Sequence, residues 1–389
     1  MPTTEAFRGL GCTATGERYD ATATGDSDAG ARLDADYDYD AVDWTGDDFG
    51  TARSMWRYAD LLAFEDPVTA GEGGTPLVDA AALAAEAEVG TLSIKDESRN
   101  PTGTVLDRGL STAVTAAREA DADLVALASP GNAGQSAASY AGMADIRSYA
   151  FVPSRAPFSN KAMVNVHGGE MRVAGGRYPD AEAALHEDLK SEWYTLQEFA
   201  NPHRHDGLKT VAFEVAESLS WSVPDAVVVP AGTGEVAAGV VKGFRELREI
   251  GLVDAIPPVY AAQPSGCAPL ATAFERGDDT HDPWESPDTI VGELEIPDPN
   301  GGEAALSAVA ETDGGFVAVD DDDALESAVV AAQRAGLEVG AAGGVALAAV
   351  ERLVGEGTFD ADDHVVAVNT ESGTKTADVL RSHLMGKGI

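Results

Sequence analysis

The sequence predicts an α/β protein with two domains, each built on a parallel sheet with flanking helices. Three observations support this prediction. From about Trp56 onward, short apolar runs alternate with helical stretches. Glycine-rich loops follow several of the apolar runs. The chain has 389 residues, 44% of them hydrophobic, enough to bury the cores of two domains. Repeated strand–helix–strand units join parallel strands through right-handed crossovers.

Seven apolar runs have the length of buried strands and lack the longer periodicity of helices. We assign them to residues 124–128, 149–153, 170–174, 226–230, 258–263, 316–319 and 364–369, and we expect a further strand around Lys95.

Helical periodicity occupies the stretches between the apolar runs. We assign helices to residues 111–120, 179–190, 210–219, 240–250, 323–336 and 343–357. The segment 276–288 is rich in Pro and Asp and is predicted to be an exposed loop.

The strand and helix pattern divides the chain into three parts. Residues 53–111 and 200–389 are predicted to form the larger domain, and residues 112–199 the smaller one. Residues 1–52 are predicted to form an N-terminal arm. Within it, residues 13–50 are rich in Asp, Gly, Ala and Thr, so we expect a loosely ordered segment.

The charge of the chain excludes several classes of function. Its formal net charge of −40 repels nucleic acid and anionic lipid. Dispersed carboxylates with scarce lysine are typical of proteins from a salt-rich cytoplasm, where screening makes self-repulsion tolerable. We find no apolar run long enough for a membrane span and no signal peptide. Two cysteines are too few for a disulfide framework or a metal site. We therefore expect a cytoplasmic protein.

Four loops are candidates for a functional site: residues 100–109, 129–136, 230–239 and 369–375. The last three follow predicted strands. In a parallel sheet, ligands bind beyond the carboxyl ends of the strands, so these loops are expected to meet at one cleft. Any one of them alone is most simply a structural turn.

The loop sequences resemble those of threonine synthase, a member of the fold-type II family of pyridoxal-phosphate (PLP) enzymes. The resemblance runs from about Arg53 to Leu384. It rests on "EGGTPLV" (72–78), "KDESRNPTG" (95–103), "NPHRHDGLKTVAFE" (201–214) and "VVPAGTG" (228–234). It implies the two-domain, tryptophan synthase β-like architecture, with the cofactor between the domains. "LGCTATGERY" also resembles a zinc-ribbon lead-in, but only Cys12 of that cluster is present, so metal binding does not carry over.

The resemblance also implies a set of site residues. Cofactor contacts fall on Asn132, Gly232, Thr233, Gly234 and Thr370, and substrate contacts on Thr104, Ser129, Gly131, Asn132 and Ala133.

The position of the family's Schiff-base lysine holds Leu106. A leucine forms no imine, moves no α-proton and releases no product by transaldimination. It is suited to packing, because Leu106, Leu110 and Val114 share one helix face. Among the remaining lysines, Lys95, Lys161, Lys209 and Lys375 give no evident substitute.

Two further positions depart from the family pattern. Glu235 follows the glycine-rich phosphate loop, where a carboxylate facing the phosphate costs roughly 4 kcal/mol per pair of unit charges at about 4 Å. Alternatively, Glu235 points into solvent. Pro130 removes an N–H from the loop that binds the substrate carboxylate, and Ala133 stands where the family usually has threonine.

These departures give three hypotheses. The first is a threonine synthase-like protein without PLP lyase chemistry, which binds a small amino-acid-like or phosphorylated metabolite, or serves as partner or regulatory subunit of an active paralogue. The second is a working threonine synthase or related amino-acid lyase with a rearranged site. The third is a different enzyme in the same cleft, whose candidate polar residues are Asn132, Thr104, Asp107, Arg108, Glu235 and Thr370. A homodimer is implied by resemblance alone.

Overall fold

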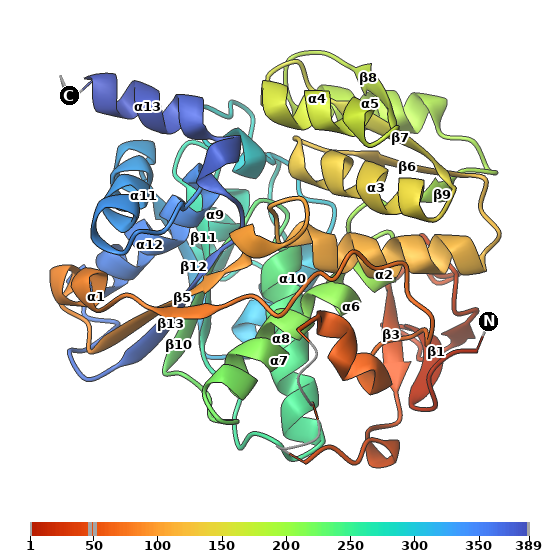
Figure 1. The fold of residues 1–389 in the computed structure, drawn as a ribbon, viewed down its shortest axis with the longest axis horizontal. Coiled ribbons are helices and arrows are strands. Elements are labelled where there is room, and N and C mark those ends of the chain that lie inside the picture. The colour runs from red at the N-terminus through yellow and green to blue at the C-terminus, as the bar shows by residue number, and fades with distance from the viewer. Residues whose placement is uncertain (1, 46–48, 50–52, 387–389) are drawn as a thin grey trace.

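The computed structural model describes residues 2–45, 49 and 53–386, and it arranges their strands in three sheets (Figure 1). The largest has the strand order β12-β11-β10-β13-β5-β4. Its strands are β4 (Leu77–Asp79), β5 (Thr91–Asp96), β10 (Ala226–Pro230), β11 (Val259–Pro264), β12 (Gly315–Val319) and β13 (His364–Asn369). All neighbouring strands in it are parallel except the edge strand β4, which runs antiparallel to β5.

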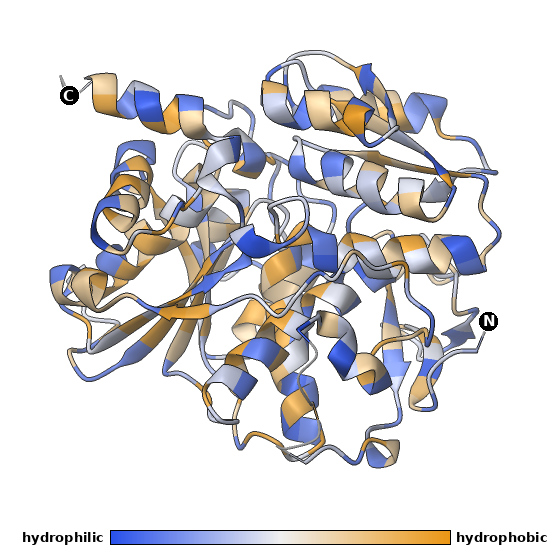
Figure 2. Cartoon of the chain, viewed as in Figure 1, coloured by the Kyte–Doolittle hydropathy of each residue, from blue (hydrophilic) through white to orange (hydrophobic). Residues whose placement is uncertain are grey.

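Helices cover both faces of this sheet because successive side chains of a strand point to opposite faces. Val227 and Val229 pack in the core that includes α7 and α8, whereas Val228 packs in the core that includes α11 and α12. Figure 2 shows that the strands between these helices are largely apolar. The helices of this part are α1 (Ala81–Ala87), α6 (Pro202–Leu208), α7 (Thr210–Ser218), α8 (Glu235–Glu249), α9 (Pro269–Arg276), α10 (Gly302–Ala310), α11 (Asp321–Arg334), α12 (Ala341–Gly355) and α13 (Ala377–Gly386).

The second sheet is parallel throughout and has the order β8-β7-β6-β9. Residues of α2, α3 and α4 share the core on one face of it, and residues of α5 share the core on the other. Its elements are α2 (Leu106–Glu119), β6 (Leu124–Ala128), α3 (Asn132–Met143), β7 (Arg147–Val152), α4 (Phe158–Val166), β8 (Glu170–Val173), α5 (Tyr178–Asp188) and β9 (Tyr194–Thr195). This confirms the predicted α/β class.

The domain boundaries stay predictions, and the predicted one at residue 111 lies inside a continuous helix. The strands of the second sheet all come from residues 124–195, and those of the six-stranded sheet come from 77–96 and 226–369. α2 runs unbroken from Leu106 to Glu119, and its residues Leu110, Ala113, Val114 and Ala117 pack in the core of the smaller sheet. Therefore α2 joins the two parts rather than ending at their boundary.

The prediction of a loosely ordered segment at 13–50 is wrong for its described part. Residues 2–45 contain a third sheet, with the antiparallel order β2-β1-β3, made of β1 (Phe7–Cys12), β2 (Arg18–Tyr19) and β3 (Leu33–Tyr37). Along β3, Leu33, Ala35 and Tyr37 are buried and alternate with two aspartates. Such an alternation with a period of two residues indicates a strand. It was overlooked because the segment as a whole is rich in aspartate. Residues 46–48 and 50–52 lie outside the described residues.

Two side chains of β3, the half-buried Asp34 and the buried Tyr37, hold this sheet against α6 and α8. Asp34 accepts hydrogen bonds from Lys242 Nζ at 2.5 Å and from His205 Nε2 at 3.0 Å. Tyr37 donates from its hydroxyl to Asp206 at 2.6 Å. The N-terminal sheet is therefore docked on the larger part through charged pairs as well as apolar contacts. Among the described residues, no group of three or more His, Cys, Asp or Glu side chains is placed to hold a metal ion.

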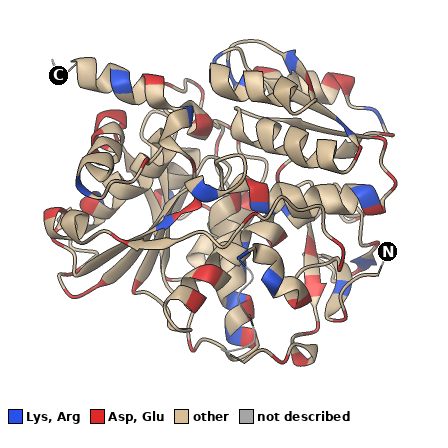
Figure 3. Ribbon diagram, in the orientation of Figure 1, with Lys and Arg blue, Asp and Glu red and all other residues tan. Residues whose placement is uncertain are grey.

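Aspartate and glutamate residues are spread over many elements (Figure 3). No helix in the described part of the chain is long and apolar enough to cross a membrane. With a net charge of −40, the folded chain concentrates negative charge that the unfolded chain spreads apart.

We expect the melting temperature to rise by several degrees as KCl is raised from about 0.01 M to about 1 M, because the Debye length falls from about 30 Å to about 3 Å. Thermal denaturation followed by circular dichroism measures this. A parallel series in sucrose, which does not screen charge, is the control. A melting temperature that is flat or falls with KCl would contradict the expectation.

Candidate functional site

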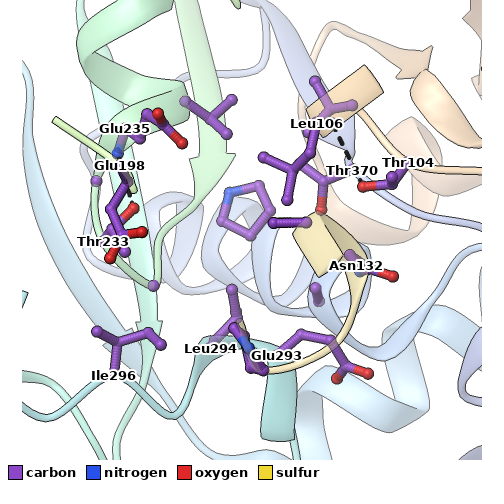
Figure 4. A pocket seen from close by; sticks show the side chains of 18 of the residues that line it. Thr104, Leu106, Asn132, Glu198, Thr233, Glu235, Glu293, Leu294, Ile296 and Thr370 are labelled. Carbon is purple, nitrogen blue, oxygen red and sulfur yellow. Dashed lines mark hydrogen bonds between the residues drawn. The ribbon is translucent and has the colours of Figure 1, made fainter. Parts of the chain in front are cut away.

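A cavity of about 90 Å³ lies between the two parallel sheets, beyond the carboxyl ends of β6, β10 and β13 (Figure 4). It brings together parts of all four loops named from the sequence. The residues that line it are Thr104, Val105, Leu106, Ala128, Pro130, Asn132, Ala133, Tyr178, Glu198, Arg204, Pro230, Gly232, Thr233, Gly234, Glu235, Val236, Glu293, Leu294, Ile296, Ala342 and Thr370.

Leu106 lines the cavity at the first residue of α2. The segment before it is fixed by backbone hydrogen bonds, because Val105 N donates to Thr370 O at 2.9 Å and Thr104 forms a bridge with Glu371. The Leu106 side chain is half-buried and packs against the cores of both parts of the chain. No lysine is among the described residues that line the cavity.

Asp107 and Arg108, candidates under the third hypothesis, do not line the cavity. Asp107 is buried and accepts hydrogen bonds from the Thr102 and Ser136 hydroxyls, both at 2.6 Å. Burial raises the pKa of Asp107 to about 6. Since α2 begins at Leu106, the two following side chains point to other faces of the helix. Both residues therefore support the structure of the loop rather than contact a ligand.

Arg108 is fully buried in an ionic cluster with Lys95, Glu97 and Glu214. Its guanidinium donates to Glu97 from Nε at 2.7 Å and to Glu214 from Nη2 at 2.7 Å. Lys95 Nζ donates to the same Glu214 Oε2 at 2.6 Å. The cluster ties α2 to β5 and α7, and so fixes the start of α2 beneath the cavity.

Within the loop at 129–133, Ser129 and Gly131 do not line the cavity, whereas Pro130, Asn132 and Ala133 do. Ser129 Oγ accepts the backbone N–H groups of Gly131 and Gly134, both at 3.0 Å, and its side chain is fully buried. Ser129 therefore shapes the turn into α3. The proposed role of these residues in binding a substrate stays a prediction.

Asn132 and Thr370 line the cavity as the resemblance implies, but the amide of Asn132 is already bonded within the protein. Its Nδ2 donates to Glu371 Oε2 at 2.6 Å, and its Oδ1 accepts from Asn160 Nδ2 at 3.0 Å. Glu371 is fully buried, and burial raises its pKa. A ligand that used the Asn132 amide would have to replace one of these bonds.

The glycine-rich turn before α8 forms the opposite wall. Gly234 has φ of +82°, and a Cβ there would lie 2.4 Å from Ala305 Cβ, so the turn requires glycine. Glu235 is the first residue of α8 and is only 2% exposed. It does not point into solvent, which was one of the two alternatives. Its Oε2 accepts from Arg204 Nη2 at 2.7 Å.

Eight cavity residues lie outside the four loops named from the sequence, namely Ala128, Tyr178, Glu198, Arg204, Glu293, Leu294, Ile296 and Ala342. Arg204 lies 3.7 Å from Glu198 and 2.7 Å from Glu235, so it bridges the two carboxylates. Tyr178 donates from its hydroxyl to Glu198 at 2.7 Å. Arg204 belongs to the segment "NPHRHDGLKTVAFE" (201–214), which was quoted for the resemblance but gave no site residue.

Lys375 is a buried amine near this region but is absent from the cavity wall. Its Nζ donates to Gln135 Oε1 at 2.8 Å and to Asn160 Oδ1 at 3.2 Å. Burial lowers its pKa. It is therefore the amine to examine first if this protein forms an imine.

The sequence matches the family model described as "Pyridoxal-phosphate dependent enzyme" over residues 68–371. It is 33% identical over 341 residues to a threonine synthase of Methanosarcina acetivorans, covering 87% of this chain and 84% of that protein. A threonine synthase of Methanocaldococcus jannaschii is 31% identical, with 90% and 88% covered. Among solved structures, an L-serine ammonia-lyase from Rhizomucor miehei is similar with a TM-score of 0.69 at 20% identity, covering 79% of this chain and 97% of that one. A threonine deaminase isoform from Solanum lycopersicum has a TM-score of 0.66 at 20% identity, with 78% and 86% covered.

PLP, which the matched family uses, does not fit the residues that line this cavity. An imine requires an amine, and there is no lysine among the described residues that line the cavity. The turn at Gly232–Gly234, where the resemblance places the phosphate, is followed by a buried carboxylate at Glu235. Among the described lining residues, the polar side chains are carboxylates, hydroxyls, the Asn132 amide and the Arg204 guanidinium.

Proposed function

This chain belongs to the family of pyridoxal-phosphate dependent enzymes, and on that premise we propose that it is a threonine synthase-like protein without lyase chemistry that binds a small metabolite in the cleft. The observation that carries the proposal is the cavity wall itself. Leu106 lies where the resemblance requires the Schiff-base amine, and Glu235 is buried beside the turn that would receive the phosphate.

A second function is a working threonine synthase with a rearranged site. It is favoured by the 33% identity with a threonine synthase over 87% of this chain, and by Asn132 and Thr370 in the cavity wall. In that case another amine has to replace the missing lysine. Lys375 is the candidate, because it is buried and its pKa is lowered. A homodimer, an active paralogue as partner and a salt-rich cytoplasm remain predictions for either function.

We expect the purified protein to stay colourless when PLP is added, and to form no threonine from O-phosphohomoserine. The internal imine of a PLP enzyme absorbs visible light and is trapped by borohydride as a modified lysine. An absorption spectrum before and after PLP and borohydride, followed by peptide mapping, checks this. A borohydride-reducible yellow species mapped to one peptide, and abolished by Lys375→Gln, would establish the second function instead.

A further inference from the structure

Three buried polar atoms of the cavity-lining residues have no hydrogen-bond partner among the described residues: Glu235 Oε1, Glu293 Oε1 and Arg204 Nε. Glu235 is 2% exposed and Arg204 is 3% exposed. An unpaired polar atom in such a place destabilises the fold, and it does so more strongly when it belongs to a charged group. Each of these atoms lacks a hydrogen bond, which a bound molecule would supply once the side chain turned toward the cavity.

The charges around the cavity select the kind of molecule. Glu198, Glu235 and Glu293 contribute three carboxyl groups to the wall, while Arg204 contributes the one guanidinium among the described lining residues. Arg204 bonds Glu235 Oε2 and lies near Glu198, so its single charge is shared between two acids. Figure 4 shows Glu198 and Glu235 together on one side of the cavity, opposite Leu106 and Thr104. This side favours a cation and repels a phosphate.

The pKa of Glu235 depends on its burial and on the charges around it. Burial raises that pKa, and the nearby Glu198 raises it further, while Arg204 lowers it. An ammonium group beside Glu235 would stabilise the carboxylate and reverse the shift. The unpartnered Arg204 Nε would meet an oxygen of the same molecule, because a guanidinium only donates.

We propose that the cavity binds the ammonium group of a small, phosphate-free amino acid or amino alcohol against Glu235, with Arg204 Nε donating to an oxygen of that ligand. A cavity of about 90 Å³ is well above the roughly 10–15 Å³ that one water requires, so it has room for a small molecule. The inference rests on the proposed function, because it requires that the region beside the turn before α8 binds an ammonium group rather than a phosphate.

Three probes that differ by one group test the proposal: homoserine, O-phosphohomoserine and 4-hydroxybutyrate. O-phosphohomoserine adds a phosphate to homoserine, and 4-hydroxybutyrate lacks its amine. Isothermal titration of the wild-type protein is expected to give at least tenfold tighter binding of homoserine than of either other probe. Equal or tighter binding of O-phosphohomoserine, or of 4-hydroxybutyrate, would overturn the inference, as would no binding of homoserine.

Variants at Glu235 separate charge from shape. Glu235→Gln should weaken homoserine binding at least tenfold, whereas Glu235→Asp should keep the preference for the amine-bearing probe. Glu249→Gln, at an exposed position near the end of the same helix, is the matched control and should bind as wild type. Thermal melting reports whether each variant folds. If Glu235→Gln does not fold, the comparison of Glu235→Asp with wild type still decides. A Glu235→Asp protein that binds homoserine no more tightly than 4-hydroxybutyrate overturns the inference.

The two proposals fail in different ways. If O-phosphohomoserine binds best and the protein stays colourless with PLP, only the cation subsite is wrong. If PLP gives a reducible visible species and threonine forms, the proposed function is wrong and the inference falls with it.

Discussion

Leu106→Lys alone is expected to take up PLP weakly and to form no threonine. The new amine would stand at the first residue of α2 and reach into the cavity beside apolar neighbours. Desolvation lowers the pKa of such a lysine and leaves a larger neutral fraction able to form an imine. The phosphate would still meet the buried Glu235 carboxylate, at a cost of roughly 4 kcal/mol at about 4 Å.

Adding Glu235→Gly should tighten PLP binding at least tenfold over Leu106→Lys. It removes the repelling carboxylate and also frees Arg204 Nη2, which donates to Glu235 in the present structure, while Nη1 stays bonded to Leu196 O. A guanidinium released beside the glycine-rich turn can pair with a phosphate. Turnover is expected only when Pro130 is replaced as well, since proline offers no N–H to a substrate carboxylate.

Spectral titration with PLP and an assay of threonine formation measure this series. Leu106→Met, which is apolar and has no amine, is the control and should remain colourless. The effects should be non-additive because the three positions serve one ligand. Full PLP occupancy and threonine formation by Leu106→Lys alone would mean that Glu235 and Pro130 are tolerated, and that a single change removed the activity.

Apolar runs located several strands because those strands are buried on both faces. The predicted residues 124–128, 226–230 and 364–369 coincide with β6, β10 and β13. The apolar period placed the start of α8 too late, at residue 240 instead of 235, and assigned α2 only from residue 111, although Leu106 was expected on the face of that helix. The first turns of α2 and α8 lie in the loops that line the cavity, and their polar and glycine residues interrupt the apolar period on which the prediction relied.

The composition of the cavity wall was the part that the sequence could not supply. Leu106, Pro130 and Glu235 were found because they depart from a familiar pattern at fixed positions. The pairing of Glu235 with Arg204 joins residues 31 positions apart, and it depends on how α6 lies against α8. No periodicity or motif in one segment reports such a contact, so the burial of Glu235 became evident only from the fold.

Glu214→Gln is expected to lower the free energy of unfolding by about 3–5 kcal/mol, because removing one member of a buried ion cluster leaves an uncompensated charge. Glu214 is 4% exposed, and its two oxygens accept from Arg108 and Lys95. With glutamine there, two buried cations would face the single carboxylate of Glu97. That loss is a large fraction of the total stability of an ordinary domain, about 5–15 kcal/mol.

The same cluster predicts a dependence on pH. Burial opposes the ionisation of Glu214, but Arg108 and Lys95 outweigh it and hold its pKa well below the usual value. A pKa that is lower in the folded than in the unfolded state contributes stability above the unfolded pKa, about 4.3, and the contribution is lost as the pH falls below it. The difference in stability between wild type and Glu214→Gln should therefore narrow as the pH is lowered through about 4.

Urea denaturation across that pH range measures this difference. The control is Glu249→Gln at an exposed position, which should stay within about 0.5 kcal/mol of wild type. A Glu214→Gln protein as stable as wild type at neutral pH would show that this cluster does not stabilise the packing of α2 beneath the cavity.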